Sequence, residues 1–348
     1  MSLEGRYDDE ADVVRVGGDA RQRYHDSRGY GYPLSGNEIA LAPVEAAHLL
    51  FRGDLEAVVD ADGNRLGFRS FVAREPGEEF GVRFLVYADL RSRGFYLSPA
   101  AEPWIDDPPA TDFAVFPRGM GPGDGEIGYA LRVIGERTDV PADELRKGVL
   151  AVVDEESEIT YFDVDRRDPE GSTTTALPDG CAADLLADRV VVWEPPVELY
   201  EGGFYGQPLE GREYDRPTLQ CSLLEAAYLA ERGAIDLESE TVRRRGRDVE
   251  GERFHRRLTV YAELRDRGVV PKTGYKFGAD FRTYAHVESV DDLGHSELLI
   301  RVHPAEYVFE PRDLSLDVRL AHGVRKTMVF ALVDGDGIEW WSLERLTP

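Results

Sequence analysis

The chain contains two copies of one module, and this repeat constrains the possible folds more than any other feature. The segment RFLVYADLRSRG at 83–94 returns 174 residues later as RLTVYAELRDRG at 257–268. Three further pairs of segments match in the same order: 30–36 with 205–211, 45–49 with 225–229, and 146–164 with 325–343. A shared helical pattern could explain one match, but four in order indicate the duplication of a module of about 165 residues.

Within each module the hydrophobic period changes from helical to β-type. Apolar residues at helical spacing predict four helices, over 34–55, 80–94, 218–237 and 255–268. Glycines suited to helix C-termini stand at Gly53, Gly94, Gly233 and Gly268. Short β-type runs follow, at 113–116, 128–134, 148–154 and 158–164, and again at 280–284, 296–303, 326–334 and 338–343. Each module is therefore predicted to have a helical or α+β head followed by a mostly β domain.

The charge is strongly negative. Asp and Glu number 67 against 41 Lys and Arg, which gives a net charge of −26, and only four of the cations are lysines. Dense salt screens such self-repulsion over ~3 Å at 1 M, so this balance is typical of proteins from halophiles. An ordinary acidic cytosolic protein is the alternative. By composition alone, such a chain is a poor candidate for binding nucleic acid.

Size and composition exclude several classes of protein. The 348 residues suggest two domains or more, and 42% hydrophobic residues exclude wholesale disorder. We expect no membrane span, since no apolar run approaches ~20 residues, and no signal peptide, since the N-terminus is acidic. Two cysteines, Cys181 and Cys221, are too few for a disulfide scaffold and favour a cytoplasmic location.

Three titratable residues stand at the ends of predicted strands in the second module. Tyr284 closes one strand, His295 precedes the next, and Lys326 opens a third. A scaffold can hold such side chains rigidly over a cleft. Tyrosine at a strand end is more often a packing residue, and a single histidine is usually structural or solvated. Lys326 is less ordinary, because arginine fills most other cationic positions and an ammonium is not equivalent to a guanidinium.

The segments 260–284, 294–302 and 324–334 strongly resemble the archaeal tRNA-splicing endonucleases, also called tRNA-intron lyases. Through the repeat, the resemblance covers essentially the whole chain. It implies an α+β fold of two tandem repeats, each with an N-terminal α/β subdomain and a C-terminal nuclease domain similar to restriction endonucleases. It also implies the two-repeat class of the family, which acts as a homodimer.

The repeat and the resemblance together predict five segments. The first repeat has an N-terminal α/β subdomain and a degenerate, inactive nuclease-like domain; a polar linker follows; the second repeat has another α/β subdomain and the catalytic nuclease domain. Their predicted bounds are 1–80, 81–167, 168–184, 185–254 and 255–348.

The family's catalytic triad corresponds to Tyr284, His295 and Lys326. The resemblance implies cleavage of precursor tRNA in a bulge-helix-bulge, with no metal and no cofactor. The 2′-OH of RNA lies within reach of the adjacent phosphorus, so intramolecular attack has a high effective molarity. Tyr284 would be the general base, His295 the general acid and Lys326 the counter-charge, giving a 2′,3′-cyclic phosphate and a 5′-OH. A phenol needs a neighbouring cation to lower its pKa, and Lys326 is the candidate.

The first module is predicted to be inactive. Alignment of the repeats puts Phe116 at the position of Tyr284, Glu126 opposite His295, and Lys147 at the position of Lys326. Phenylalanine cannot move a proton, so this module is interpreted as structural. A homodimer would then hold four modules and two active sites.

Two arginines and two acidic turns are further candidates. By resemblance, Arg319 and Arg345 would grip a bulged base between their planes, which suits guanidinium stacking; either could instead be a surface ion-pair partner. The acidic turns Asp154–Ser157 and Asp334–Gly337 correspond to a family loop that enters a basic cleft of a neighbouring module, or are solvated hairpin tips. No role is predicted for His303 and His322.

Two other functions compete with this prediction. Restriction-like folds are mostly metal-dependent DNA nucleases, which use an acidic residue shortly before the lysine to bind Mg²⁺. Here Val324 and Arg325 precede Lys326, so that signature is missing. The other alternative is a non-catalytic RNA-binding or structural subunit of a splicing endonuclease, against which the intact triad argues.

Overall fold

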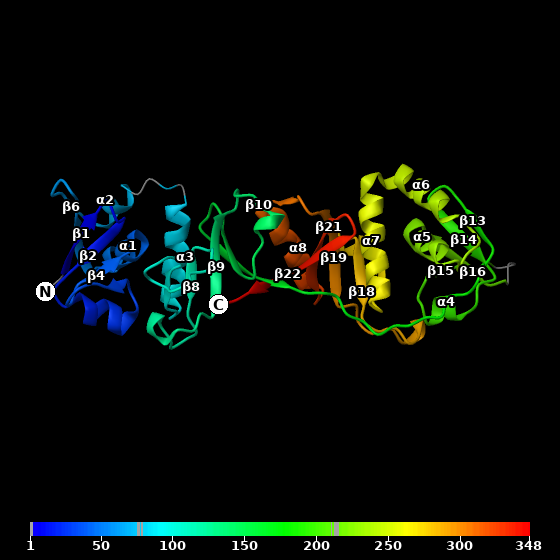
Figure 1. The fold of residues 1–348 in the computed structure, drawn as a ribbon, viewed down its shortest axis with the longest axis horizontal. Helices are drawn as coiled ribbons and strands as arrows, with labels where there is room; N and C mark the ends of the chain where they lie inside the picture. The colour runs from blue at the N-terminus through cyan, green and yellow to red at the C-terminus, as the bar shows by residue number, and fades with distance from the viewer. Residues whose placement is uncertain (1–2, 75–76, 78, 210, 212–215) are drawn as a thin grey trace.

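The computed structural model describes residues 3–74, 77, 79–209, 211 and 216–348. The molecule is elongated (Figure 1): an N-terminal unit lies at each end and one large sheet lies between them. Helix α3 (Phe80–Ser92) separates the sheet from the first N-terminal unit, and α7 (Glu252–Asp266) stands in the corresponding place on the other side. The predicted α+β fold of two repeats is confirmed.

The two N-terminal units are small sheets with helices. The first has strand order β3-β4-β2-β1-β5-β6, with β1 Leu3–Asp8, β2 Val13–Val16, β3 Tyr32–Pro33, β4 Ile39–Leu41, β5 Leu55–Val59, β6 Arg65–Leu66, the π-helix η1 Arg21–Asp26, α1 Pro43–Phe51 and α2 Phe68–Val72. The second has the order β13-β14-β16-β15, with β13 Ala183–Leu185, β14 Arg189–Trp193, β15 Gln207–Pro208, β16 Thr218–Ser222, α4 Glu198–Glu201, α5 Leu223–Glu231 and α6 Ser239–Glu250.

The central sheet has ten strands in the order β17-β18-β19-β21-β22-β12-β11-β9-β8-β7. From the first module come β7 Leu97–Pro99, β8 Phe113–Val115, β9 Tyr129–Gly135, β11 Gly148–Val153 and β12 Ile159–Arg166. From the second come β17 Val270–Thr273, β18 Phe281–Tyr284, β19 Leu298–Pro304, β21 Thr327–Asp334 and β22 Gly337–Leu346. The short strands β10 (Val140–Pro141) and β20 (Val308–Phe309) pair separately, and the 3₁₀ turns are η2 Pro122–Asp124, η3 Ala142–Glu144, η4 Tyr275–Phe277 and η5 Val290–Asp292.

The last strand of each module joins the two halves. Strands β12 and β22 pair antiparallel in the middle of the sheet, from Tyr161 opposite Leu346 to Arg166 opposite Trp341. One hydrophobic core lies across this seam and contains buried residues of both modules, including Phe162, Phe330 and Leu343. The two nuclease-like halves are therefore one folded body, because neither can bury this face alone.

Two predicted helices are wrong in their first parts. In 34–55 the segment Ile39–Leu41 is the buried strand β4, and the helix begins only at Pro43, where a missing N–H costs nothing. In 218–237 the strand β16 comes first, and Ser222 then caps α5 by accepting a hydrogen bond from the backbone N–H of Glu225. A short apolar run does not distinguish a buried strand from a helix, so periodicity alone missed both.

Two further features position the site. Helix α8 (Pro311–Gly323) covers one face of the sheet in the second module, where the first has only the turn η3. The predicted linker is docked on the second module: Gly171 and Thr173 donate backbone hydrogen bonds to the carbonyls of Arg267 and Gly268.

Cys181 and Cys221 are both free thiols. Among the described residues, none of the helices combines the length and the apolar character needed to cross a bilayer.

Candidate active site

Strand register brings the three predicted catalytic residues to one end of the central sheet. Strands β18 and β19 are antiparallel and pair Thr283 with Leu298, while β19 and β21 are parallel and pair Leu298 with Thr327. Tyr284 follows Thr283 and Lys326 precedes Thr327, so both lie level with Glu297 on either side of it. Their Cα atoms are thus two strand spacings apart, about 10 Å. His295 lies two residues before Glu297 in the segment that enters β19.

Tyr284 is held by packing. Its residue is 7% exposed and lies in a small apolar cluster with Phe204, Val270 and Val287. The ring centroids of Tyr284 and Phe204 are 5.8 Å apart. A ring confined in this way offers its hydroxyl in a narrow range of positions, which suits a group that must meet a substrate proton.

Lys326 and His295 are more open. Lys326 is half-buried, its Nζ donates a hydrogen bond to the carbonyl of Ser296, and the same nitrogen lies 5.9 Å from the centre of the Phe277 ring. Partial burial lowers the pKa of Lys326, and the charge of Arg282 lowers it further. The bond to Ser296 ties the lysine to the residue next to His295, whose own side chain is exposed to solvent.

Arg282 is a site residue that the sequence analysis missed. Its guanidinium carbon lies 5.7 Å from the centre of the Tyr284 ring, and its charge acts on Lys326. Its Nε is buried and has no hydrogen-bond partner in the described part of the chain. Lys326 was expected to be the cation beside the phenol; the cation in contact with that ring is Arg282. A comparison of the repeats could have found it: Ala114 of β8 occupies the position of Arg282 in the first module, so the arginine is present only in the second.

The side chains near this end of the strands have the chemistry that cleavage of a phosphodiester requires. Two cations, a buried phenol and an exposed imidazole would provide counter-charge and two proton-transfer groups. In the part of the chain that the structure describes, no three His, Cys, Asp or Glu side chains come together as a metal ligand set.

Comparison with known proteins identifies the family. The model of the tRNA intron endonuclease catalytic C-terminal domain matches residues 254–340, and that of the tRNA intron endonuclease N-terminal domain matches 9–72 and 181–246. The tRNA-splicing endonuclease of Halobacterium salinarum is 60% identical over 97% of this chain and 98% of its own. The chain belongs to the tRNA intron endonuclease family. The repeated N-terminal match agrees with the duplication found in the sequence.

Other members of the tRNA intron endonuclease family match over nearly the whole length. The tRNA-splicing endonuclease of Haloarcula marismortui is 59% identical over 97% of this chain and 98% of its own, and that of Haloferax volcanii is 54% identical over 99% and 100%. These relatives come from halophilic archaea, which agrees with the expectation drawn from the acidic, lysine-poor composition.

Within this family frame, the first module differs from the second at the site. Phe116, at the Tyr284 position, is buried, and Glu126 is exposed. The side chain of Lys147 is 75% exposed and forms an ion pair of 3.1 Å with Asp165. The first module thus has neither the phenol nor the Arg282 charge, and its lysine is paired with a carboxylate.

Arg319 and Arg345 are both exposed to solvent and lie on the same face of the molecule. Both line one hollow, Arg319 from α8 and Arg345 from β22. The same hollow contains Asp154 and Glu155 of the first acidic turn. That turn closes the β11–β12 hairpin through backbone hydrogen bonds to the Asp154 carboxylate, and Asp334–Gly337 closes the β21–β22 hairpin.

The two histidines without a predicted role have different environments. His303 stacks on Tyr307 with ring centroids 3.8 Å apart, and burial lowers the pKa of His303 to about 4. This is the environment of a neutral packing residue. His322 is exposed at the end of α8.

Proposed function

We propose that this chain cleaves precursor tRNA at intron–exon junctions, in a bulge-helix-bulge, without a metal ion. The observation that carries the proposal is the register that puts Tyr284, His295 and Lys326 at one end of three neighbouring strands, inside the segment that matches the catalytic domain. The names of the relatives, all tRNA-splicing endonucleases, supply the substrate class.

In the proposed reaction, Tyr284 removes the proton of the 2′-OH at the cleavage site. The 2′-oxygen attacks the adjacent phosphorus, the new P–O2′ bond forms, and the P–O5′ bond breaks. His295 gives a proton to the leaving 5′-oxygen. The products are a 2′,3′-cyclic phosphate and a 5′-OH, so the atoms and protons balance with no added reactant.

Lys326 and Arg282 supply the positive charge of the site. A pentacoordinate phosphorane gathers negative charge on its oxygens, and fixed cations stabilise that charge more than they stabilise the substrate. The guanidinium carbon of Arg282 lies 5.7 Å from the centre of the Tyr284 ring, so this charge is close to the proposed base as well as to Lys326.

Arg319 and Arg345 are proposed to hold the bulged nucleotide. Their common hollow supports this, since two guanidinium planes can enclose a base. The first module serves as scaffold, and a homodimer provides two sites for the two junctions of an intron. Such an enzyme would act in the cytoplasm, where the substrate is made.

The test is cleavage of a bulge-helix-bulge RNA by the full-length protein in molar KCl with excess EDTA. We expect two cuts, with cyclic phosphate and 5′-OH ends identified by their response to phosphatase and kinase. Cleavage abolished by EDTA and restored by Mg²⁺ would instead identify a metal-dependent nuclease. Tight RNA binding without cleavage, unchanged in Tyr284→Phe, would identify a non-catalytic subunit.

A further inference from the structure

Phe204 adopts a backbone conformation that bulky residues rarely adopt. Its φ is +52°, in the left-handed region that favours glycine. After α4 the chain turns through two backbone hydrogen bonds, in which Phe204 donates to the carbonyl of Tyr200 and Tyr205 donates to that of Leu199. The first module has the same pattern of hydrogen bonds with Gly29, whose φ is +65°, in the place of Phe204. The second module thus carries a large ring where glycine satisfies the backbone.

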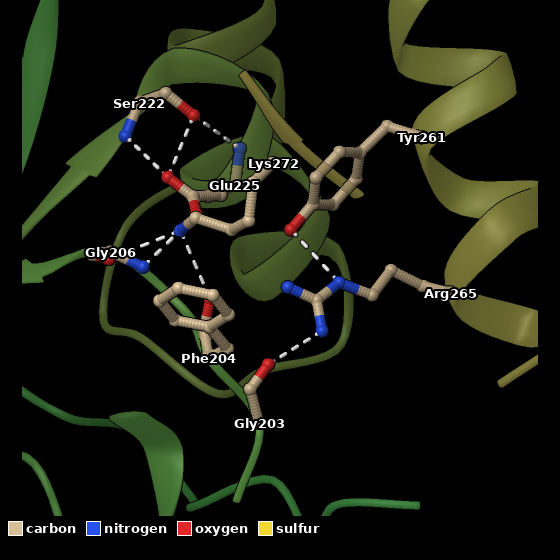
Figure 2. A network of polar contacts seen from close by, with 8 residues as sticks. All are labelled: Gly203, Phe204, Gly206, Ser222, Glu225, Tyr261, Arg265 and Lys272. Atoms are coloured by element: carbon tan, nitrogen blue, oxygen red, sulfur yellow. Dashed lines mark hydrogen bonds and ion pairs between the residues drawn. The ribbon is translucent and has the colours of Figure 1, made fainter. Parts of the chain in front are cut away.

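The backbone around Phe204 is clamped from both sides (Figure 2). Lys272 donates three hydrogen bonds, to the carbonyls of Phe204 (3.0 Å) and Gly206 (3.1 Å) and to the Glu225 carboxylate (2.8 Å). Arg265 donates to the carbonyl of Gly203 (2.7 Å). Both cations lie inside the protein, and the side chain of Lys272 is only 13% exposed.

Part of this clamp is absent from the first module. Arg91, the repeat of Arg265, donates to the carbonyl of Arg28, as Arg265 does to that of Gly203. Ser98 stands at the ladder position of Lys272, however, and Glu45 receives its side-chain hydrogen bond from Trp104 instead. The first module therefore has no lysine that corresponds to Lys272, which donates to the carbonyl of Phe204 in the second.

The ring of Phe204 is in contact with Tyr284, the candidate base. It packs on Tyr284 with an interplanar angle of 59°, and Lys272 Nζ lies 4.7 Å from its centre. In the first module the tyrosine, the phenylalanine and the lysine are all replaced, by Phe116, Gly29 and Ser98. Glycine would adopt this backbone conformation without strain, as Gly29 does in the first module. The presence of a strained phenylalanine instead indicates that its ring has a function.

We propose that Phe204, fixed by Lys272, is a positioning residue that sets the orientation of the Tyr284 phenol. This rests on the proposed function, in which Tyr284 is the base. The N-terminal unit of the second module thereby completes the active site of the nuclease domain, since Phe204 and Glu225 belong to the former and Tyr284 and Lys272 to the latter.

The test is Phe204→Gly in the full-length protein, because the first module demonstrates that glycine satisfies this turn. We expect the variant to fold with a lower melting temperature, because loss of a buried ring costs more stability than relief of the backbone strain returns, and circular dichroism checks that it is folded at the assay temperature. The single-turnover rate constant at saturating RNA should fall about tenfold to a hundredfold, as for small misplacements of reacting groups. The dissociation constant for RNA should stay unchanged. Phe204→Tyr, which keeps the ring, should keep most of the rate.

A double-mutant cycle separates this proposal from the proposed function. If Phe204 acts through Tyr284, then Phe204→Gly has no further effect in a Tyr284→Phe background. A wild-type rate for Phe204→Gly, or an equal loss in both backgrounds, would overturn the positioning role while leaving Tyr284 as the base. A wild-type rate for Tyr284→Phe would overturn both.

Discussion

Phe116 and Tyr284 occupy the same place in the two repeats and differ by one hydroxyl group. Both are buried, so packing does not distinguish them. Their surroundings do: Tyr284 has Arg282 beside it, whereas Ala114 replaces that arginine in the first module. A single residue is thus informative only together with the charges that the fold brings to it.

We expect Tyr284→Phe, His295→Ala and Lys326→Ala each to reduce the single-turnover cleavage rate by ~10²–10⁴-fold, the usual contribution of one such group. The folded state should survive, because all three residues stand at strand ends and contribute little to the main cores. Circular dichroism and a single-turnover assay check this.

Lys147→Ala is the matched control, since this lysine is mostly exposed and already paired with Asp165. Its cleavage rate should equal that of the wild type. A loss as large as that of Lys326→Ala would mean that the first module is also an active site.

Arg282→Met should also slow cleavage, by about tenfold or more, because it removes a fixed charge close to the developing anion. The loss should appear in the rate constant at saturating RNA rather than in the dissociation constant. In this variant the pKa of Lys326 should rise, since Arg282 is one of the two causes that lower it. Full activity would exclude Arg282 from the mechanism.

At the scale of elements, two buried glutamates perform the same task with different partners. Glu45 and Glu225 each accept hydrogen bonds from the first backbone N–H groups near their own helix, α1 or α5, and from a glycine of the preceding loop. Burial raises the pKa of Glu45. Burial would do the same for Glu225, but Lys272 and the backbone donors outweigh it and lower the pKa of Glu225 to about 2.

This difference predicts that acid weakens α5 more than α1. A carboxylate whose pKa is about 2 in the folded state, against 4.5 ordinarily, stabilises the fold above pH 4.5 and loses that contribution as the pH falls toward 2. The contribution is about 3 kcal/mol. The pKa of Glu45 is raised in the folded state, so its contribution to stability changes with pH in the opposite direction. Native-state hydrogen exchange should therefore show α5 losing stability relative to α1 between pH 5 and pH 3.

Lys272→Met should remove that pH dependence and lower the free energy of unfolding at pH 7 by about 3–5 kcal/mol, because it leaves a buried charge unpaired. Trp104→Phe is its counterpart in the first module and should cost only about 1 kcal/mol, the value of one hydrogen bond. Equal costs for the two variants would contradict the assignment of the ion pair.

At the scale of the whole molecule, the seam between β12 and β22 and the net charge of −26 act together. The seam joins the two halves of an acidic chain into one body, so salt that screens the repulsion between their charges favours the folded sheet. Ion pairs such as Arg166–Glu339 and Arg167–Glu344 cross the seam and offset a part of this repulsion.

We therefore expect the melting temperature to rise between low salt and molar KCl, with dimerisation favoured and cleavage of a bulged RNA retained at the high end. Salt weakens contacts to phosphates, but it also screens the global repulsion between an acidic protein and RNA. A melting temperature that does not change with salt, with cleavage lost at 1 M KCl, would contradict the halophilic interpretation and leave the nuclease assignment intact.

The sequence by itself determined the duplication, the family and most strands of the central sheet. These depend on local patterns: identical segments in order, alternating apolar residues, and Tyr284, His295 and Lys326 inside one long motif. The strands predicted over 148–154 and 326–334, for example, are β11 and β21. Such features survive in the sequence because each is encoded by neighbouring residues.

Only the tertiary structure decided how the pieces act together. The β12–β22 seam pairs residues about 180 positions apart, and no local pattern encodes a partner at that distance. Arg282 became a site residue because strand register turns it toward Tyr284 and Lys326. In the sequence Phe204 is one more apolar residue. In the fold its backbone is left-handed, and Lys272, 68 residues away, donates a hydrogen bond to its carbonyl. Long-range contacts can hold a conformation against local preference, and in this chain they do so beside the candidate base.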